Sequence, residues 1–300
     1  MSTPTTLSRP SAPPRADVVR ALARIEATRL LRHPAPWIGL VLAVLWARSA
    51  MSDPTWSSAQ YEGLATAITP LLGGASLATL SVFAREHVTL AEDAPLSPTA
   101  RSVARLLAGL VLVGLITVVV AAVAVWLRLR DGLPLGDEPG ATAHAHYTLP
   151  ELLQPVLLAA FAVAVGAAAA HLVRQRLAAA IVLVLAWFVI GATYWVFTNG
   201  AALWVTPLQV LPVDVGIGPP STDPTTFPSD WLLSTPGEYQ HEWRRLVVSP
   251  ALAAWHCVYV VGLTAMAVAA AVPGRVRRVL LPAGAVVAVA AVLLQSVVAP

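Results

Sequence analysis

Residues that could perform catalysis are few in this 300-residue chain. The chain has no Gly-x-x-x-x-Gly-Lys-Ser/Thr motif, and none of its 19 basic residues is lysine, so it cannot form a phosphate-binding loop of that type. Its one cysteine, Cys257, lies in an apolar run, and the outer segments 132–150 and 199–249 assemble no Ser/His/Asp or Cys/His constellation by sequence proximity. We therefore expect no catalytic centre, no cofactor and no nucleotide hydrolysis in this chain.

The spacing of His144 and His146 would place two imidazoles together, as in a metal site. Only Asp137 and Glu138 accompany them, whereas zinc sites normally take three or four protein ligands. We interpret the pair as part of a solvated loop, and its role stays open.

Weakly polar and small residues recur at helical spacing in one apolar run, at Thr66, Thr69, Gly73 and Ser76, with Pro70 nearby. Such a face could line a path through a membrane or pack against another helix. Small side chains let membrane helices approach closely, so packing is the favoured interpretation.

Long uncharged runs must position these residues. Residues 106–127 contain no charge, and a helix of that length spans roughly 33 Å, enough to cross a hydrocarbon core of about 30 Å. The whole chain is 57% hydrophobic and only 12% charged. We predict an all-α, polytopic bundle of six or seven spans at residues 36–51, 63–84, 102–127, 152–172, 178–197, 248–272 and 279–298, within a membrane domain covering 34–300.

Arginine positions predict the orientation of these spans. With a cytoplasmic N-terminus, 14 of the 19 basic residues fall on the cytoplasmic side, as short cytoplasmic segments favour. The seventh span then places the C-terminus outside. The calculated pI of about 9.5 does not indicate nucleic acid, because the arginines flank apolar runs and form no continuous patch.

Charged residues are missing from the middle of every predicted span. Ion-coupled carriers usually keep a titratable group at membrane depth, and an intramembrane enzyme would need polar catalytic groups there. Both classes are therefore disfavoured.

Residues 16–33 read as an amphipathic helix that follows a disordered tail, 1–15. Arg20 and Arg24 share one face, whereas Val18, Leu22 and Ile25 share another, which Glu26 and Arg29 interrupt. The helix would lie on an anionic membrane surface or form a solvated segment beside the membrane. It should end at His33-Pro34.

The cytoplasmic loop 85–101 joins the second and third spans. Ser97-Pro98 is a strong helix start, because the hydroxyl can cap free N–H groups and proline suits the first helical position. Both flanking spans are expected to leave the membrane as continuous helices. On the other side, residues 199–249 should form a partly ordered cap, with a short helix at 238–246.

This loop resembles that of the permease subunits of type-2 ABC exporters, whose pattern is close to R-E-x-x-T-L followed by x-P-[LV]-[ST] and a basic residue. The matching residues here are Arg85, Glu86, Thr89, Leu90, Pro95, Leu96, Ser97 and Arg101, with Glu92 and Asp93 in the acidic stretch between. The amphipathic segment resembles the family's elbow helix, including Arg20, Arg24 and Glu26. Residues 256–263 resemble an H-x-x-Y-x-x-G-L stretch of actinobacterial members.

The resemblance implies a multi-pass permease subunit of the bacterial plasma membrane that dimerises and exports its substrate. Loop 85–101 would dock on a separate ATPase subunit and receive the movement that ATP binding produces. The family typically has six spans, so the seventh is a departure. The alternative is a membrane scaffold or assembly protein without an ATPase partner, and the substrate is left open.

Overall fold

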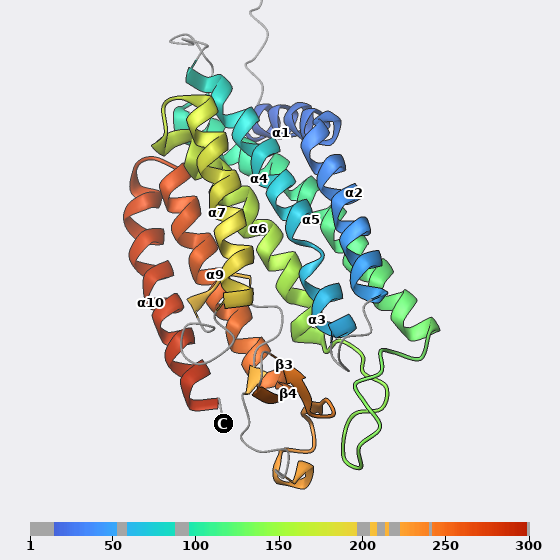
Figure 1. Ribbon diagram of the computed structural model, residues 1–300. Coiled ribbons are helices and arrows are strands. Elements are labelled where there is room, and N and C mark those ends of the chain that lie inside the picture. Colours follow the sequence, from blue (N-terminus) through green and yellow to red (C-terminus); the bar gives the residue numbers. More distant parts are fainter. Residues whose placement is uncertain are drawn as a thin grey trace, which may run out of the picture.

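The computed structural model describes residues 15–52, 59–87, 96–196, 205–208, 214–215, 223–239 and 242–298. Helices dominate this part of the chain (Figure 1). They are α1 (Arg15–Arg32), α2 (Pro34–Met51), α3 (Ala59–Thr66), α4 (Thr69–Phe83), α5 (Pro98–Leu129), α6 (Leu149–Leu172), α7 (Arg176–Val196), α9 (Pro250–Ala271) and α10 (Arg275–Val298), with the 3-10 turns η1 (Ala84–His87) and η2 (Pro224–Thr226). The predicted tail 1–15 lies outside the described residues, except for Arg15.

Within the described residues, six helical segments are long and apolar enough to cross a membrane: α2, the α3–α4 pair, α5, α6, α9 and α10. The predicted fifth span corresponds to α7, whose apolar part, Arg176–Gly191, is shorter. Ile38, Leu110 and Val286 are each more than half exposed on α2, α5 and α10. This apolar outer surface is the one that lipid would cover.

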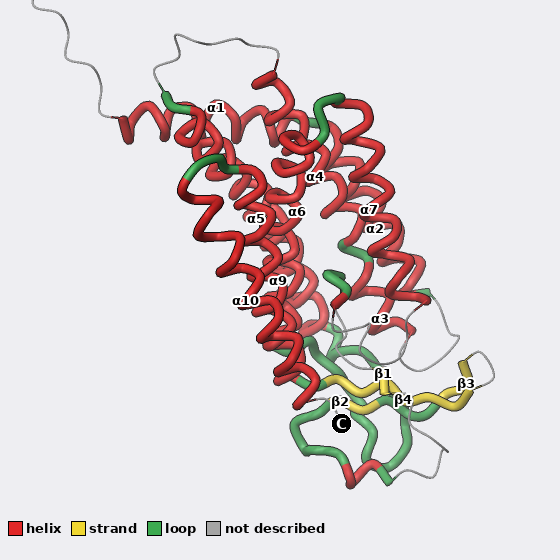
Figure 2. Tube along the Cα trace, turned by 90° about the vertical axis from the view of Figure 1, so that its left-hand side faces the viewer, coloured by secondary structure: helices red, strands yellow, loops and turns green. Residues whose placement is uncertain are grey.

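The bundle has two different ends (Figure 2). Helix α1 runs across one end, which we call the α1 end, where the α6–α7 and α9–α10 turns also lie. The strands and the end of α10 lie at the opposite, strand end. The chain reaches the α1 end at Leu172 and starts α9 from the strand end, so α7 must carry it back between them.

The predicted second span is not one continuous helix but is broken between α3 and α4, at Ala67 and Ile68. Pro70 has no N–H to donate to the carbonyl of Thr66, four residues earlier. The Thr69 hydroxyl donates to that carbonyl instead, at 2.7 Å. The broken helix is therefore repaired locally, within a buried part of the bundle.

The strand end contains a small antiparallel sheet, so the all-α prediction holds for the bundle alone. Strand β4 (Glu242–Val248) pairs with β1 (Asp214–Val215), β2 (Leu232–Leu233) and β3 (Gly237–Tyr239). The helix predicted at 238–246 is wrong. The run Leu246-Val247-Val248 is buried and ends in two β-branched residues, which favour a pleated, packed backbone over a short exposed helix. Helix α9 consequently starts at Pro250, capped by the Ser249 side chain, and not at 248.

Residues 131–148 pack against this sheet. Leu133 and Ala145 form a β-bridge, and both are buried together with Leu135. The almost fully buried Arg245 of β4 pairs with Glu138 at 2.7 Å. His144 and His146 remain exposed on this segment, in agreement with the solvated interpretation.

Helix α10 is closely packed into the bundle through α9. A Cβ atom on Gly262 of α9 would come within 2.7 Å of the Ala288 backbone nitrogen, so the two helix backbones are nearly in contact. The His256 ring of α9 lies 3.2 Å from the amide oxygen of Gln295 on α10. The helix at the predicted seventh span is thus an integral part of the structure.

Candidate functional site

Helix α1 contacts the bundle through Glu26 and Leu30, whereas Ile25 of the predicted apolar face points away from the bundle. Glu26 and Leu30 are the buried residues, with 3% and 1% of their surfaces exposed, whereas Ile25 is 53% exposed. Arg29 donates to Glu26 at 2.9 Å, and this ion pair lets a carboxylate lie against the bundle. Arg20 and Arg24 remain exposed.

The α1–α2 junction forms a sharp, hydrogen-bonded corner. Helix α1 ends at Arg32, as predicted, and His33 caps α2 by accepting a hydrogen bond from the Ala35 N–H on Nδ1. The Trp37 indole reaches back to donate to the Leu31 carbonyl at 2.6 Å. Burial, then the guanidinium groups of Arg176 and Arg85, hold the pKa of His33 below its ordinary value.

A second close contact joins α2 to α4. A Cβ atom on Gly74 of α4 would collide with the backbone carbonyl of Ala35 on α2. The two helices therefore approach at backbone distance beside the corner, and a movement of the α4 end would reach α2 and α1 directly.

The base of the hairpin formed by α4 and α5 is packed tightly. Phe83, the last residue of α4, is 1% exposed. The Arg105 guanidinium of α5 lies 5.8 Å from its ring centroid, and the His171 ring of α6 meets it edge-on at 5.9 Å. Three helices are thus joined at the point where the loop 85–101 begins.

The loop itself is described only at its two ends. Arg85 is exposed in η1, which also contains Glu86, and Leu96 is buried. Ser97 accepts from the Ala100 N–H, and α5 begins at Pro98 as predicted, with Arg101 in its first turns. The other five residues of the proposed coupling motif lie outside the described residues: Thr89, Leu90, Glu92, Asp93 and Pro95.

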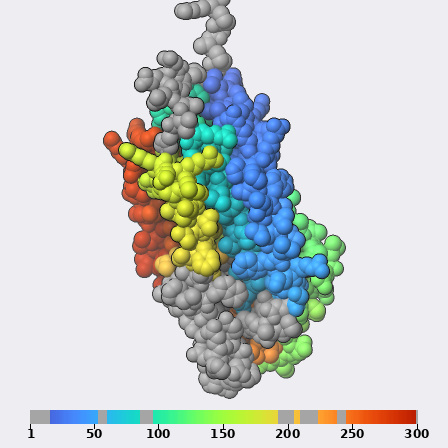
Figure 3. Space-filling view, turned by 45° about the horizontal axis from the view of Figure 1, so that its top comes forward, coloured from blue at the N-terminus to red at the C-terminus, as the bar shows by residue number. Residues whose placement is uncertain are grey.

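An apolar groove of about 810 Å³ lies between α2, α4 and α7. Figure 3 shows α4 between the surfaces of the other two helices. Thr69 and Gly73 line the groove, along with Trp187 and Phe188 of α7 and Trp46 of α2. Its walls are almost entirely hydrocarbon and aromatic.

The four residues of the predicted small polar face are all on the α3–α4 pair, but they do different things. Thr66 is 2% exposed and donates to backbone carbonyls one turn earlier. Ser76 is fully buried, donates to the Ala162 carbonyl of α6 at 2.9 Å and accepts from the Trp187 indole at 2.9 Å. Two members therefore make contacts inside the bundle, and two face the groove.

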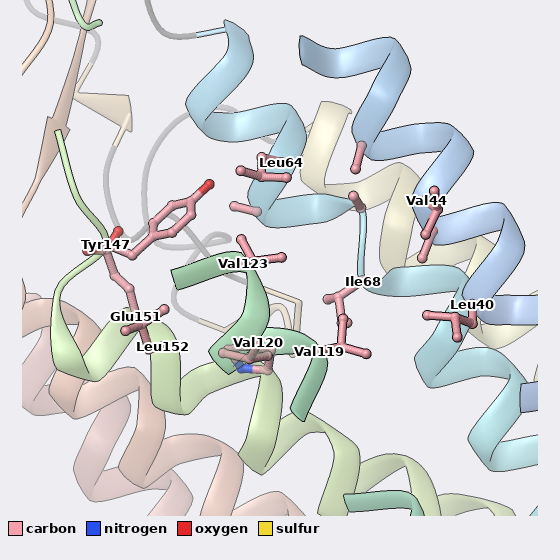
Figure 4. A pocket seen from close by; sticks show the side chains of 15 residues that line it. Leu40, Val44, Leu64, Ile68, Val119, Val120, Val123, Tyr147, Glu151 and Leu152 are labelled. Carbon is pink, nitrogen blue, oxygen red and sulfur yellow. The ribbon is translucent and has the colours of Figure 1, made fainter. Parts of the chain in front are cut away.

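A second cavity, of about 120 Å³, is lined by α2, the α3–α4 break, α5 and the start of α6. Figure 4 shows Tyr147 and Glu151 on one side of it and aliphatic side chains such as Leu40, Val44 and Val123 around the rest. Glu151 is 2% exposed. A carboxyl group thus lies within the bundle, in the first turn of α6.

Glu151 was missed because the predicted span began one residue after it. The signal was present: Thr148 and Glu151 have the Thr-x-x-Glu spacing of a capping box, which α6 forms. Helix α6 therefore begins at Leu149 and carries the carboxyl group into the bundle. No sequence pattern predicted its contact with Tyr61, 90 residues away.

Among the described residues, no group of three or more His, Cys, Asp and Glu side chains could hold a metal ion. Comparisons with family models, with curated proteins and with solved structures found no match. The functional argument therefore depends on this chain's own sequence and geometry.

Proposed function

We propose that this chain is the membrane-spanning permease subunit of an ATP-driven ABC exporter, in a bacterial plasma membrane. The observation that carries the proposal is the assembly at the α1 end. A transverse helix, a fixed corner at His33 and the tightly packed base of the α4–α5 hairpin adjoin one another there. A push on the loop 85–101 would therefore be passed to α1, α2, α4 and α5 together.

The α1 end would face the cytoplasm, where ATP is available. The arginines of α1, of the α4–α5 connection and of the α6–α7 and α9–α10 turns gather at this end, which agrees with the preference of cytoplasmic segments for basic residues. The strand end would then form the external cap.

The groove between α2, α4 and α7 would contribute to the translocation path. In a dimer of permease subunits, two such grooves facing each other would enclose a larger apolar chamber, with Thr69 and Gly73 on its wall. The helix break at Pro70 lies beside this groove and gives α4 a point about which it can tilt.

Affinity purification tests the proposal against the scaffold alternative. The tagged chain is co-expressed with ABC-type ATPase subunits from its own genome, and the ATPase that co-purifies in mild detergent is quantified. Deleting residues 89–94 should abolish co-purification and leave the amount of membrane-inserted chain unchanged. A deletion of equal length in the predicted outer segment 199–249, residues 217–222, is the matched control and should retain the ATPase. Undiminished co-purification after the first deletion would refute the proposed coupling loop.

A further inference from the structure

The buried carboxylate of Glu151 is held in place by three hydrogen bonds. Tyr61 donates its hydroxyl to Oε1 at 2.8 Å, and the Thr148 N–H and hydroxyl both donate to Oε2, at 2.8 and 2.7 Å. A carboxylate has about four acceptor positions, so one position on Oε1 is left over. Neutral donors orient this group but do not neutralise its charge.

No positive side chain in the described part of the chain pairs with this carboxyl group. In the described part of the chain, no arginine or histidine nitrogen lies within 4.0 Å of the Glu151 carboxylate. A buried, ionised carboxylate is costly unless a cation accompanies it. The site therefore favours a positive ligand over a neutral or anionic one.

The cavity beside Glu151 has the size and surface for an apolar group. Its volume of about 120 Å³ is close to that of engineered apolar cavities of about 150 Å³, which bind benzene. Of the described residues that line it, Glu151 is the one charged side chain and Tyr147 the one aromatic. The Tyr147 hydroxyl is fixed by donating to the Tyr61 carbonyl at 2.6 Å, and the ring lies beside the carboxyl group, where it can contact an ammonium group.

The cavity is open to one side of the bundle. Leu40 and Val44 of α2 and Val120 of α5 are among its lining residues, and Val44 is 59% exposed on the outer surface. A ligand dissolved in the membrane could therefore enter between α2 and α5 without passing through the groove on α4 and α7.

We propose that this cavity binds lipophilic organic cations, meaning amines or quaternary ammonium compounds with a benzene-sized apolar group. The cationic group lies against Glu151 and Tyr147, and the hydrocarbon part lies among the aliphatic side chains of α2 and α5. This binding site stands apart from the proposed function, because it requires neither an ATPase nor transport.

Equilibrium binding of radiolabelled benzyltrimethylammonium to the full chain in phosphatidylcholine nanodiscs tests this site, with empty nanodiscs as the blank. The competitor is neopentylbenzene, which has the same shape without the charge. Wild-type protein should bind the cation saturably, and neopentylbenzene at equal concentration should not displace it. Absence of saturable binding, or equal displacement by the neutral compound, overturns the proposal.

Two variants and one control locate the site. Glu151→Gln removes the charge while the amide can still serve the capping box, and it should weaken binding by about tenfold or more, the equivalent of a 1.4 kcal/mol loss. Val120→Phe fills the cavity and should have a similar effect. Asp137→Asn removes an exposed charge at the same end and should bind like wild type.

Circular dichroism of each variant shows whether the helices are retained. If Glu151→Gln does not fold, binding by Val120→Phe and displacement by the neutral competitor decide whether the cation binds in this cavity. Binding by Val120→Phe within about twofold of wild type contradicts the assigned cavity. No ATPase is present in this binding assay. If the wild-type chain failed to co-purify an ATPase in the earlier experiment, or if deletion of residues 89–94 left co-purification undiminished, the proposed function would be overturned and this binding result would still stand.

Discussion

Individual polar side chains hold the helices of this protein together at points where hydrocarbon packing alone would not define a geometry. Ser76 joins α4 to α6 and α7, Glu151 joins α3 to α6, and His33 fixes the start of α2. Each of these groups is hydrogen-bonded, which lowers the free-energy cost of placing a polar group inside the bundle. Their loss should therefore be measurable.

Replacing Ser76 with valine should lower the free energy of unfolding by about 1 kcal/mol, because the buried Trp187 indole loses its acceptor. Unfolding in mixed detergent micelles, followed by tryptophan fluorescence, measures the change. Ser296→Val is the matched control, since that exposed hydroxyl bonds only within its own helix, to Leu293. An equal loss in both variants would show that the Ser76 contact has no special weight.

The stability of the α1–α2 corner should depend on pH through His33. A histidine whose pKa is lowered in the folded state stabilises the protein above its unfolded pKa of about 6.5, and this stability is lost as the pH falls through the folded pKa. Protonation also turns the accepting Nδ1 into a donor and removes the cap. The melting temperature of wild type should therefore fall more steeply between pH 7.5 and 5 than that of His33→Asn.

Asparagine is a good helix cap that does not titrate, so the variant isolates the protonation of His33. Arg176 and Arg85, the charges that face His33, are unchanged in it. Parallel melting curves for wild type and His33→Asn across this range would contradict the assignment.

Helices of this bundle could be located from hydrophobic runs, but their internal breaks and contacts could not. The start of α5 followed directly from Ser97 and Pro98, whose effect is local. Pro70 was noted only as a neighbour of the small polar face, and a continuous span was predicted. The break at Pro70 and its repair by Thr69 depend on three-dimensional geometry, which the sequence does not display. Strand β4 was mistaken for a helix because its partners β1, β2 and β3 are brought to it only by folding.

Helix α10 should be sensitive to substitution at its closest contact with α9. Gly262→Val places a branched side chain against the Ala288 backbone and should destabilise the protein by about 1–3 kcal/mol through overpacking. Thermal unfolding in detergent measures this effect. Gly114→Val on α5 is the control, because nothing lies within 4 Å of its added Cβ atom. A melting temperature of Gly262→Val equal to that of Gly114→Val would contradict the close α9–α10 packing.

At the scale of the molecule, the arginine distribution predicts sidedness, and among the described residues the chain path places the arginines of the two predicted groups at opposite ends. The groove and the cavity at Glu151 could not have been foreseen, since each is formed by residues from several helices. The absence of charge from the span centres holds, but a carboxyl group sits just inside the first turn of α6. This carboxyl group was missed because the predicted start of the span lay a few residues too late.

Cysteine labelling should show that the α1 end is cytoplasmic. In a Cys257→Ser background, an impermeant maleimide applied to intact cells should leave Ser97→Cys unlabelled and should label Asp137→Cys, both positions being exposed. Permeabilised cells should show labelling at both positions. The reverse pattern in intact cells would place the loop 85–101 outside, where no ATPase could reach it.

The rate of ATP hydrolysis tests the central claim most directly. The purified chain in nanodiscs should hydrolyse no ATP above the blank, and adding it to its co-purifying ATPase should raise the rate of that ATPase. The chain lacking residues 89–94 should leave the rate at that of the ATPase alone. Hydrolysis by the chain without a partner, or full stimulation by the deleted form, would contradict the account.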